Sequence, residues 1–246
     1  MANPLPLVAL AGDDAVTTAT ISMTNEDADF PAENAQSYNP AKLAKSTTNT
    51  TTFTITTSSI TPVAIALIQT NAETATLNGN AITIPALDSD GQRIHPWLDM
   101  RGSPLASGTT WTLVLSKASG TVFIGRICLV VALHELNVRY GWEVGRNRPG
   151  ETTIETRGGS ILKHTMELRS RWAQGVVNLL EDEALLASLD SSAKGSNIPY
   201  LLIPDEVVND AWYVRQSSPY RKGYPDIDVR ETPLRFDELS NGPVNG

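Results

Sequence analysis

The chain has 246 residues, of which 41% are hydrophobic and 19% are charged, a composition that excludes a membrane-embedded or a disordered protein. The 19 Lys and Arg residues are outnumbered by 27 Asp and Glu, and the resulting net charge of −8 argues against a nucleic-acid binder. One cysteine and three histidines exclude an internal disulfide and a cysteine-based zinc cluster. We expect one large domain or two small ones, with no cofactor and no metal.

Residues 1–19 are expected to form an N-terminal arm. The segment from Leu5 to Ala11 is apolar, but it is short, lacks a basic flank and is interrupted by Pro6. It therefore fits neither a signal peptide nor a membrane span, and we expect synthesis in a cytosol without membrane insertion. Such an arm would pack along a neighbouring protein, and its removal over residues 1–12 would weaken assembly and leave the fold intact.

Residues 20–136 carry the pattern of an antiparallel β-sandwich. Residues 51–56 alternate hydroxyl-bearing and apolar side chains, which predicts a strand with one buried face. Residues 63–68 are continuously apolar, which predicts a buried central strand. The many β-branched residues and regular turns of this part favour an antiparallel sandwich and a mainly β fold.

Two strand pairs are expected within this sandwich. Residues 74–77 and 81–84 flank an Asn78-Gly79 turn, the dipeptide that tight hairpins prefer. Residues 111–115 and 121–131 are expected to pair with each other through a turn at 117–120.

Residues 137–240 are expected to form a small α+β domain with one helix, followed by a loose tail over residues 241–246. The helix is predicted over residues 174–189, where apolar residues recur at spacings of three and four. Strands are predicted around it, over residues 152–157 and 161–172, which meet at Gly158-Gly159, and over residues 200–203, 211–216 and 226–236.

Motifs of known chemistry are incomplete in this chain. His134-Glu135 lacks the second histidine of a zinc-protease helix, since Val138 stands at that position. Adjacent acidic residues at 181–183 cannot face each other across a cleft, so they predict a solvated helix face rather than a glycosidase pair. Cys128 lies in an apolar run and is expected to be inert core.

The candidate ligand-binding residues, for a glycan or calcium, are Trp97, Asp88 and Asp90. Asp88-Ser89-Asp90-Gly91 resembles the start of a calcium loop, but the twelfth position is Asp99 instead of Glu, and an ordinary Asp-Gly turn is favoured. Trp97 follows His95-Pro96 in an expected loop, where an exposed indole would stack on a sugar. Structural roles are the alternative for this tryptophan, as for the others.

Several short segments resemble bacteriophage structural proteins. The segments are Asp29-Phe30-Pro31-Ala32-Glu33-Asn34, Ala44-Lys45-Ser46-Thr47 and residues 63–71, followed later by residues 162–172, 198–205 and 234–239. The earlier group resembles the opening of a galactose-binding-like jelly roll, and the later group is similar to tail-tip and distal-tail proteins that build a ring under the tail tube. In distal-tail proteins the ring-forming domain usually comes first, whereas here the sandwich comes first.

The resemblance implies a non-enzymatic structural subunit of a phage tail tip or baseplate. It would form a homo-oligomeric ring, contact other tail or baseplate proteins, assemble in the bacterial cytoplasm and reside in the virion. It transfers no catalytic residues. The alternative is a carbohydrate-binding module that recognises host surface glycans through the sandwich loops. A third hypothesis, an envelope-degrading glycosidase or esterase, lacks an identifiable nucleophile or acid–base pair.

Overall fold

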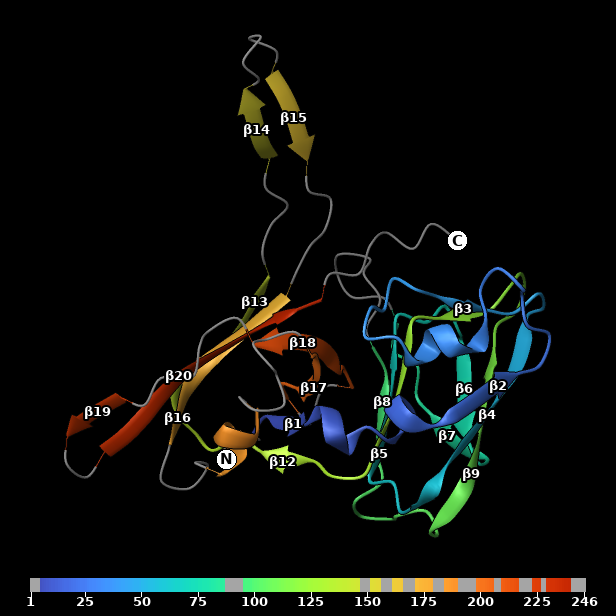
Figure 1. The fold of residues 1–246 in the computed structure, drawn as a ribbon, viewed down its shortest axis with the longest axis horizontal. Helices are drawn as coiled ribbons and strands as arrows, with labels where there is room; N and C mark the ends of the chain where they lie inside the picture. The colour runs from blue at the N-terminus through green and yellow to red at the C-terminus, as the bar shows by residue number, and fades with distance from the viewer. Residues whose placement is uncertain are drawn as a thin grey trace.

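The computed structural model describes residues 5–86, 95–146, 151–155, 161–165, 171–178, 184–189, 198–205, 209–216, 223–226 and 229–239. Over these residues the protein is mainly β, with antiparallel sheets, three short 3-10 helices and an α-helical segment at 184–189. The expected fold class is confirmed. Figure 1 shows a sandwich built from the first half of the chain beside a sheet of long strands from the second half.

One face of the sandwich is a five-stranded sheet, called here the outer sheet, with the order β2-β4-β9-β6-β7. Its strands are β2 (Thr20–Met23), β4 (Thr50–Ile60), β6 (Thr74–Leu77), β7 (Asn80–Ile82) and β9 (Gly108–Ser116). Along β4, Phe53 and Ile55 are buried while Thr54 is exposed, as the two-residue period predicted. Asn78 and Gly79 have φ angles of 46° and 82°, the two positive values that a type I′ hairpin turn requires.

The other face is a three-stranded middle sheet, with the order β11-β5-β8. Its strands are β5 (Ala64–Ile68), β8 (Trp97–Asp99) and β11 (Arg126–Val130). Every residue of β5 and β11 is buried because both faces of the sheet are covered. Ile65 and Leu67 pack toward the outer sheet, and Ala66 and Ile68 pack the other way. Coverage on two sides explains why residues 63–68 are continuously apolar.

The predicted pairing of residues 111–115 with residues 121–131 is wrong. Strand β9 pairs with β4 and β6, whereas β11 pairs with β5, and β10 (Phe123–Ile124) pairs with β3 (Ala44–Lys45). Leu113 and Leu129 belong to one core between the two sheets. The chain therefore crosses from one layer of the sandwich to the other between these segments.

The third layer is an eight-stranded long sheet, with the order β12-β1-β17-β18-β20-β16-β13 and with β19 paired to β20. Its strands are β1 (Leu7–Ala9), β12 (His134–Glu135), β13 (Val138–Arg146), β16 (Arg171–Asn178), β17 (Tyr200–Ile203), β18 (Trp212–Gln216), β19 (Gly223–Asp226) and β20 (Val229–Glu238). The strands predicted at 200–203, 211–216 and 226–236 are confirmed as β17, β18 and β20.

The N-terminal segment forms a strand of this sheet instead of the expected arm. Strand β1 lies between β12 and β17, with Leu7 opposite Ile203 and Val8 opposite Leu202. Leu7 and Val8 have 0% exposure. Alternate side chains of β1 are buried on opposite faces of the sheet, so its apolar run belongs to this chain's own core.

The predicted helix over residues 174–189 is partly wrong. Residues 174–178 belong to β16, and the described helical segment covers 184–189. In β16, Ala173 and Gly175 are buried while Gln174 between them is only partly so, the alternation of a strand. The predicted strand at 161–172 divides between β15 (Ile161–Thr165) and β16, while β15 pairs with β14 (Glu151–Glu155) as expected. Gly158 and Gly159 lie outside the described residues.

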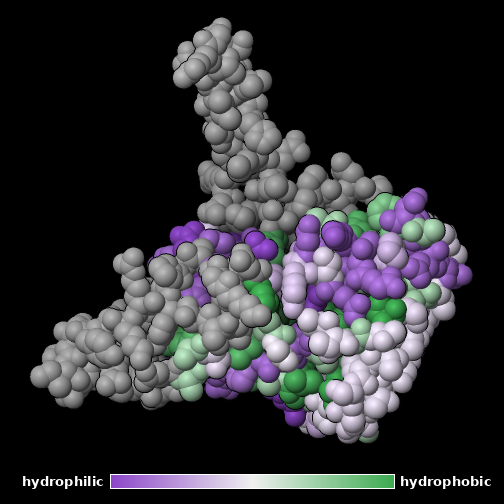
Figure 2. Space-filling view, in the orientation of Figure 1, coloured by the Kyte–Doolittle hydropathy of each residue, from purple (hydrophilic) through white to green (hydrophobic). Residues whose placement is uncertain are grey.

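The layers stack in the order outer sheet, middle sheet, long sheet and helical segment. Leu7 and Ile203 of the long sheet pack on Ala64 and Ile68 of the middle sheet. Leu186 and Leu189 of the helical segment share a further core with residues of the opposite face of the long sheet. On the face seen in Figure 2, hydrophobic side chains of the sandwich are scattered and do not form one broad patch. No helix among the described residues is long and apolar enough to cross a membrane.

Candidate functional site

Of the three residues proposed from the sequence as a ligand site, the structure describes Trp97 alone. Trp97 is the first residue of β8, pairs with Ala66 and is only 6% exposed. The expected exposed loop position is therefore wrong, because this indole packs between the middle and long sheets. Asp88 and Asp90 lie outside the described residues, as do the acidic residues at 181–183.

The other motifs take structural positions. His134 lies in β12 and its Nε2 is 3.0 Å from Asp13 Oδ2. Cys128 is 1% exposed, and burial raises the pKa of its thiol, so it stays protonated and unreactive. Over the described ranges, no group of three or more His, Cys, Asp or Glu side chains is placed to hold a metal ion.

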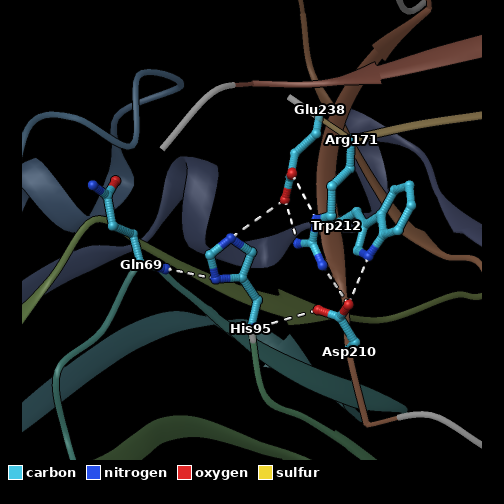
Figure 3. Close-up of polar contacts among 6 residues, drawn as sticks. All are labelled: Gln69, His95, Arg171, Asp210, Trp212 and Glu238. Atoms are coloured by element: carbon cyan, nitrogen blue, oxygen red, sulfur yellow. Dashed lines mark hydrogen bonds and ion pairs between the residues drawn. The ribbon is translucent and has the colours of Figure 1, made fainter. Parts of the chain in front are cut away.

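The structure instead brings together two buried polar clusters that the sequence reasoning missed. The first, called here the Arg171 cluster, consists of Gln69, His95, Arg171, Asp210, Trp212 and Glu238 (Figure 3). The Arg171 guanidinium donates to both oxygens of Glu238 and to the carboxylate of Asp210. Trp212 donates its indole N–H to the same Asp210 oxygen over 2.9 Å, and its ring lies 4.5 Å from the guanidinium carbon.

His95 links this cluster to the middle sheet. The backbone N–H of Gln69 donates to His95 Nδ1 over 3.1 Å, so Nδ1 carries no hydrogen. The ring proton then lies on Nε2, which is 3.5 Å from Glu238 Oε1. In this arrangement His95 is a neutral imidazole, and each of its two ring nitrogens has a contact that fixes the orientation of the ring. With His95 at 1% and Glu238 at 6% exposure, the pair acts as a connection between layers rather than as an acid and base for a substrate.

The carboxylate of Glu238 is held in its charged form. Burial alone would favour the neutral acid, but hydrogen bonds from Arg171 and His95 outweigh it and lower the pKa of Glu238 to about 2. Hydrogen bonds to Glu238 and the negative charges of Glu238 and Asp210 raise the pKa of Arg171 despite its burial. Arg171 and Glu238 thus form an ionised salt bridge inside the protein, where loss of one partner is costly.

The second cluster, called here the Arg126 cluster, lies between β11, the 3-10 helix η2 (Ala15–Thr18) and β18. The Arg126 side chain donates to the Gln36 carbonyl, the Asp14 carboxylate and, over 3.0 Å, the Thr17 hydroxyl. Its guanidinium carbon is 5.8 Å from the centre of the Tyr213 ring. Arg126 has 0% exposure; burial disfavours its charge, but the charge of Asp14 outweighs that effect and raises the pKa of Arg126.

Two polar atoms of the Arg126 cluster are incompletely satisfied. Arg126 Nε and Tyr213 Oη are buried and have no hydrogen-bond partner among the described residues. Both residues line a cavity of about 10 Å³. A groove of about 510 Å³ lies beside it and shares Asp14, Thr17 and Tyr38 with its lining. The one signal in the sequence was Arg126 itself, a charged residue inside the apolar run of residues 121–131.

Two tyrosines test this assignment of hydrogen bonds. Tyr200 donates its buried hydroxyl to the Leu189 carbonyl over 2.6 Å, so Tyr200→Phe is expected to lower the free energy of unfolding by about 1–3 kcal/mol. Tyr213→Phe removes no hydrogen bond within the described structure and is expected to cost less than about 0.5 kcal/mol. Urea unfolding of both variants measures the difference, and equal losses would contradict the assignment.

The comparison with known proteins does not assign this chain to a family. No family model matches the chain, and no curated protein matches it. Among solved structures the chain is similar to the crystal structure of SpGH29, with 15% sequence identity and a TM-score of 0.37. The similarity covers 50% of this chain and 28% of that one.

Proposed function

We propose that the chain is a non-enzymatic structural subunit of an oligomeric assembly, of the phage tail-tip or baseplate kind that the sequence resemblance implies. The observation that carries the proposal is the hairpin of β14 and β15, which forms a two-stranded sheet of its own (Figure 1). Within the described ranges, neither outer edge of this hairpin pairs with another strand. An isolated two-stranded hairpin is marginally stable in water, so a neighbouring subunit would stabilise it.

The layered body supports the same proposal. The described polar clusters connect sheets to each other through buried ion pairs, and three apolar cores lie between the layers. The β13–β16 pair belongs to this body and ends at Arg146 and Arg171, and the hairpin lies between these two residues in the sequence. A separate hairpin inserted between two strands of a well-packed sheet suits contact with neighbours in a ring.

The test compares the mass of two chains in solution. Arg146 and Arg171 are opposite each other at the end of the β13–β16 pair, so an Asn-Gly turn in place of residues 147–170 would close this pair without the hairpin. Light scattering of the full chain is expected to show a discrete closed oligomer, and the shortened chain is expected to be a folded monomer.

Circular dichroism and the unfolding midpoint of the shortened chain serve as the control for its fold. A full chain that is monomeric at every concentration would contradict the proposal. So would a shortened chain that keeps the same oligomer, since the hairpin would then make no essential contact.

A further inference from the structure

The groove beside the Arg126 cluster lies where the segment of η1 (Ala11–Asp13) and η2 meets the sandwich, and Ile198, two residues before β17, closes part of its wall. We propose that this groove binds a small neutral polyol of about the size of a monosaccharide. This groove is distinct from the hairpin of β14 and β15, and ligand binding there would be a function additional to the proposed assembly role. It also differs from the sandwich-loop residues considered from the sequence.

The size and lining of the groove suit such a molecule. Its volume of about 510 Å³ lies within the range of small-molecule sites, roughly 300–1,000 Å³. Its wall combines hydroxyl-bearing residues with apolar ones, among them Thr17, Tyr38, Thr57, Ser58, Ile60 and Val131. A polyol presents hydroxyls and C–H groups together, so it matches both kinds of surface.

The unsatisfied atoms of the Arg126 cluster point to a ligand oxygen. Arg126 and Tyr213 are 0% and 3% exposed, and a buried donor left without an acceptor costs about 1–3 kcal/mol. The cavity that they line has room for about one water-sized group. A hydroxyl both donates and accepts, so one leading hydroxyl of a ligand in the groove would complete Arg126 Nε and Tyr213 Oη.

Charge decides between a neutral and an anionic ligand. The Arg126 guanidinium is already paired with Asp14. The Asp14 side chain also accepts hydrogen bonds from the backbone N–H groups of Val16 and Leu129, each over 3.1 Å. These bonds fix the position of its carboxylate. Because Asp14 lines both the cavity and the groove, a carboxylate or phosphate would meet a like charge there. The electrostatics therefore favour a neutral polyol.

The test is a titration of the ¹⁵N-labelled full chain with glucose, myo-inositol and sodium glucuronate, followed by NMR. A neutral polyol is expected to shift the amide signals of Gly12, Thr18 and Ser58 with a Kd of about 1–10 mM. Glucuronate, which matches glucose in size but carries a negative charge, is expected to bind at least about tenfold more weakly.

Two matched variants locate the site. Tyr213→Phe is expected to weaken binding of the neutral polyol about tenfold, through loss of one hydrogen bond. Tyr200→Phe, which changes a tyrosine that does not line the groove, is expected to keep the wild-type affinity. No shift with glucose or myo-inositol at about 100 mM, a preference for glucuronate, or an unchanged affinity of Tyr213→Phe would each overturn the proposal. Loss of the oligomer in the earlier mass experiment would leave this result unaffected.

Discussion

Removal of residues 1–12 is expected to unfold the protein, in contrast to the loss of assembly alone that the sequence suggested. The deletion takes away β1, which is bonded to β12 on one edge and to β17 on the other. Burial of Leu7 and Val8 contributes about 1.5–3 kcal/mol each, or about 3–6 kcal/mol together, and the deletion also removes the strand between β12 and the rest of the sheet. The side-chain loss alone reaches the lower end of the total stability of a typical domain, about 5–15 kcal/mol. Circular dichroism and tryptophan fluorescence measure the outcome.

A point variant gives the same test in a chain that still folds. Leu7→Ala leaves a cavity between the middle and long sheets and is expected to lower the free energy of unfolding by about 2–5 kcal/mol. The matched control, Thr54→Ala on the exposed face of β4, is expected to change it by less than about 0.5 kcal/mol. A deletion variant with the unfolding midpoint of the full chain would show that β1 is dispensable.

Arg171→Met is the second change with a large expected effect. It leaves the carboxylates of Glu238 and Asp210 buried without their cation, which typically costs about 3–5 kcal/mol. The double variant Arg171→Met/Glu238→Leu removes one of the stranded charges and is expected to recover about half of that loss. Urea unfolding of the two variants and the wild type forms the comparison. A single variant as stable as the wild type would rule out a stabilising role for the cluster.

The same cluster predicts acid sensitivity. The pKa of Glu238 is about 2 in the folded protein, against 4.5 ordinarily, so the unfolded chain takes up this proton first as the pH falls. The stability that Glu238 contributes is therefore complete above about pH 4.5 and is lost progressively toward about pH 2. Glu238→Gln is expected to show a shallower loss of stability over this range. Identical pH profiles for the wild type and this variant would contradict the prediction.

The local features of the fold, including its short hairpins, were predictable, whereas the pairing of strands far apart in the sequence was not. Backbone preference and burial depend on a few neighbouring residues. They explain the alternation over residues 51–56, the apolar run over residues 63–68 and the turn at Asn78-Gly79. The partner of a strand is set by residues far away in the chain. For that reason β9 and β11 were wrongly paired, and the insertion of β1 beside β17 left no local signal.

The polar clusters could not be predicted from the sequence for a similar reason. Asp14 and Arg126, or His95 and Glu238, are separated by more than a hundred positions in the chain, so no motif contains both partners. The sequence pointed to Trp97 because His95-Pro96 before it suggested a loop, but pairing of β8 with β5 places this side chain in the interior. Arg126 gave a usable signal, since a charge within an apolar strand needs a buried partner.

The position of β1 also affects how the chain folds during synthesis. Strand β1 leaves the ribosome first. One of its edges stays unpaired until residues 134–135 are made, and the other stays unpaired until residues 200–203 are made. Pairing over such distances in sequence slows folding, and an apolar strand with free edges is prone to pair with other chains. Aggregation during expression should therefore depend on how quickly the second half of the chain is completed, and co-expressed chaperones should raise the soluble yield.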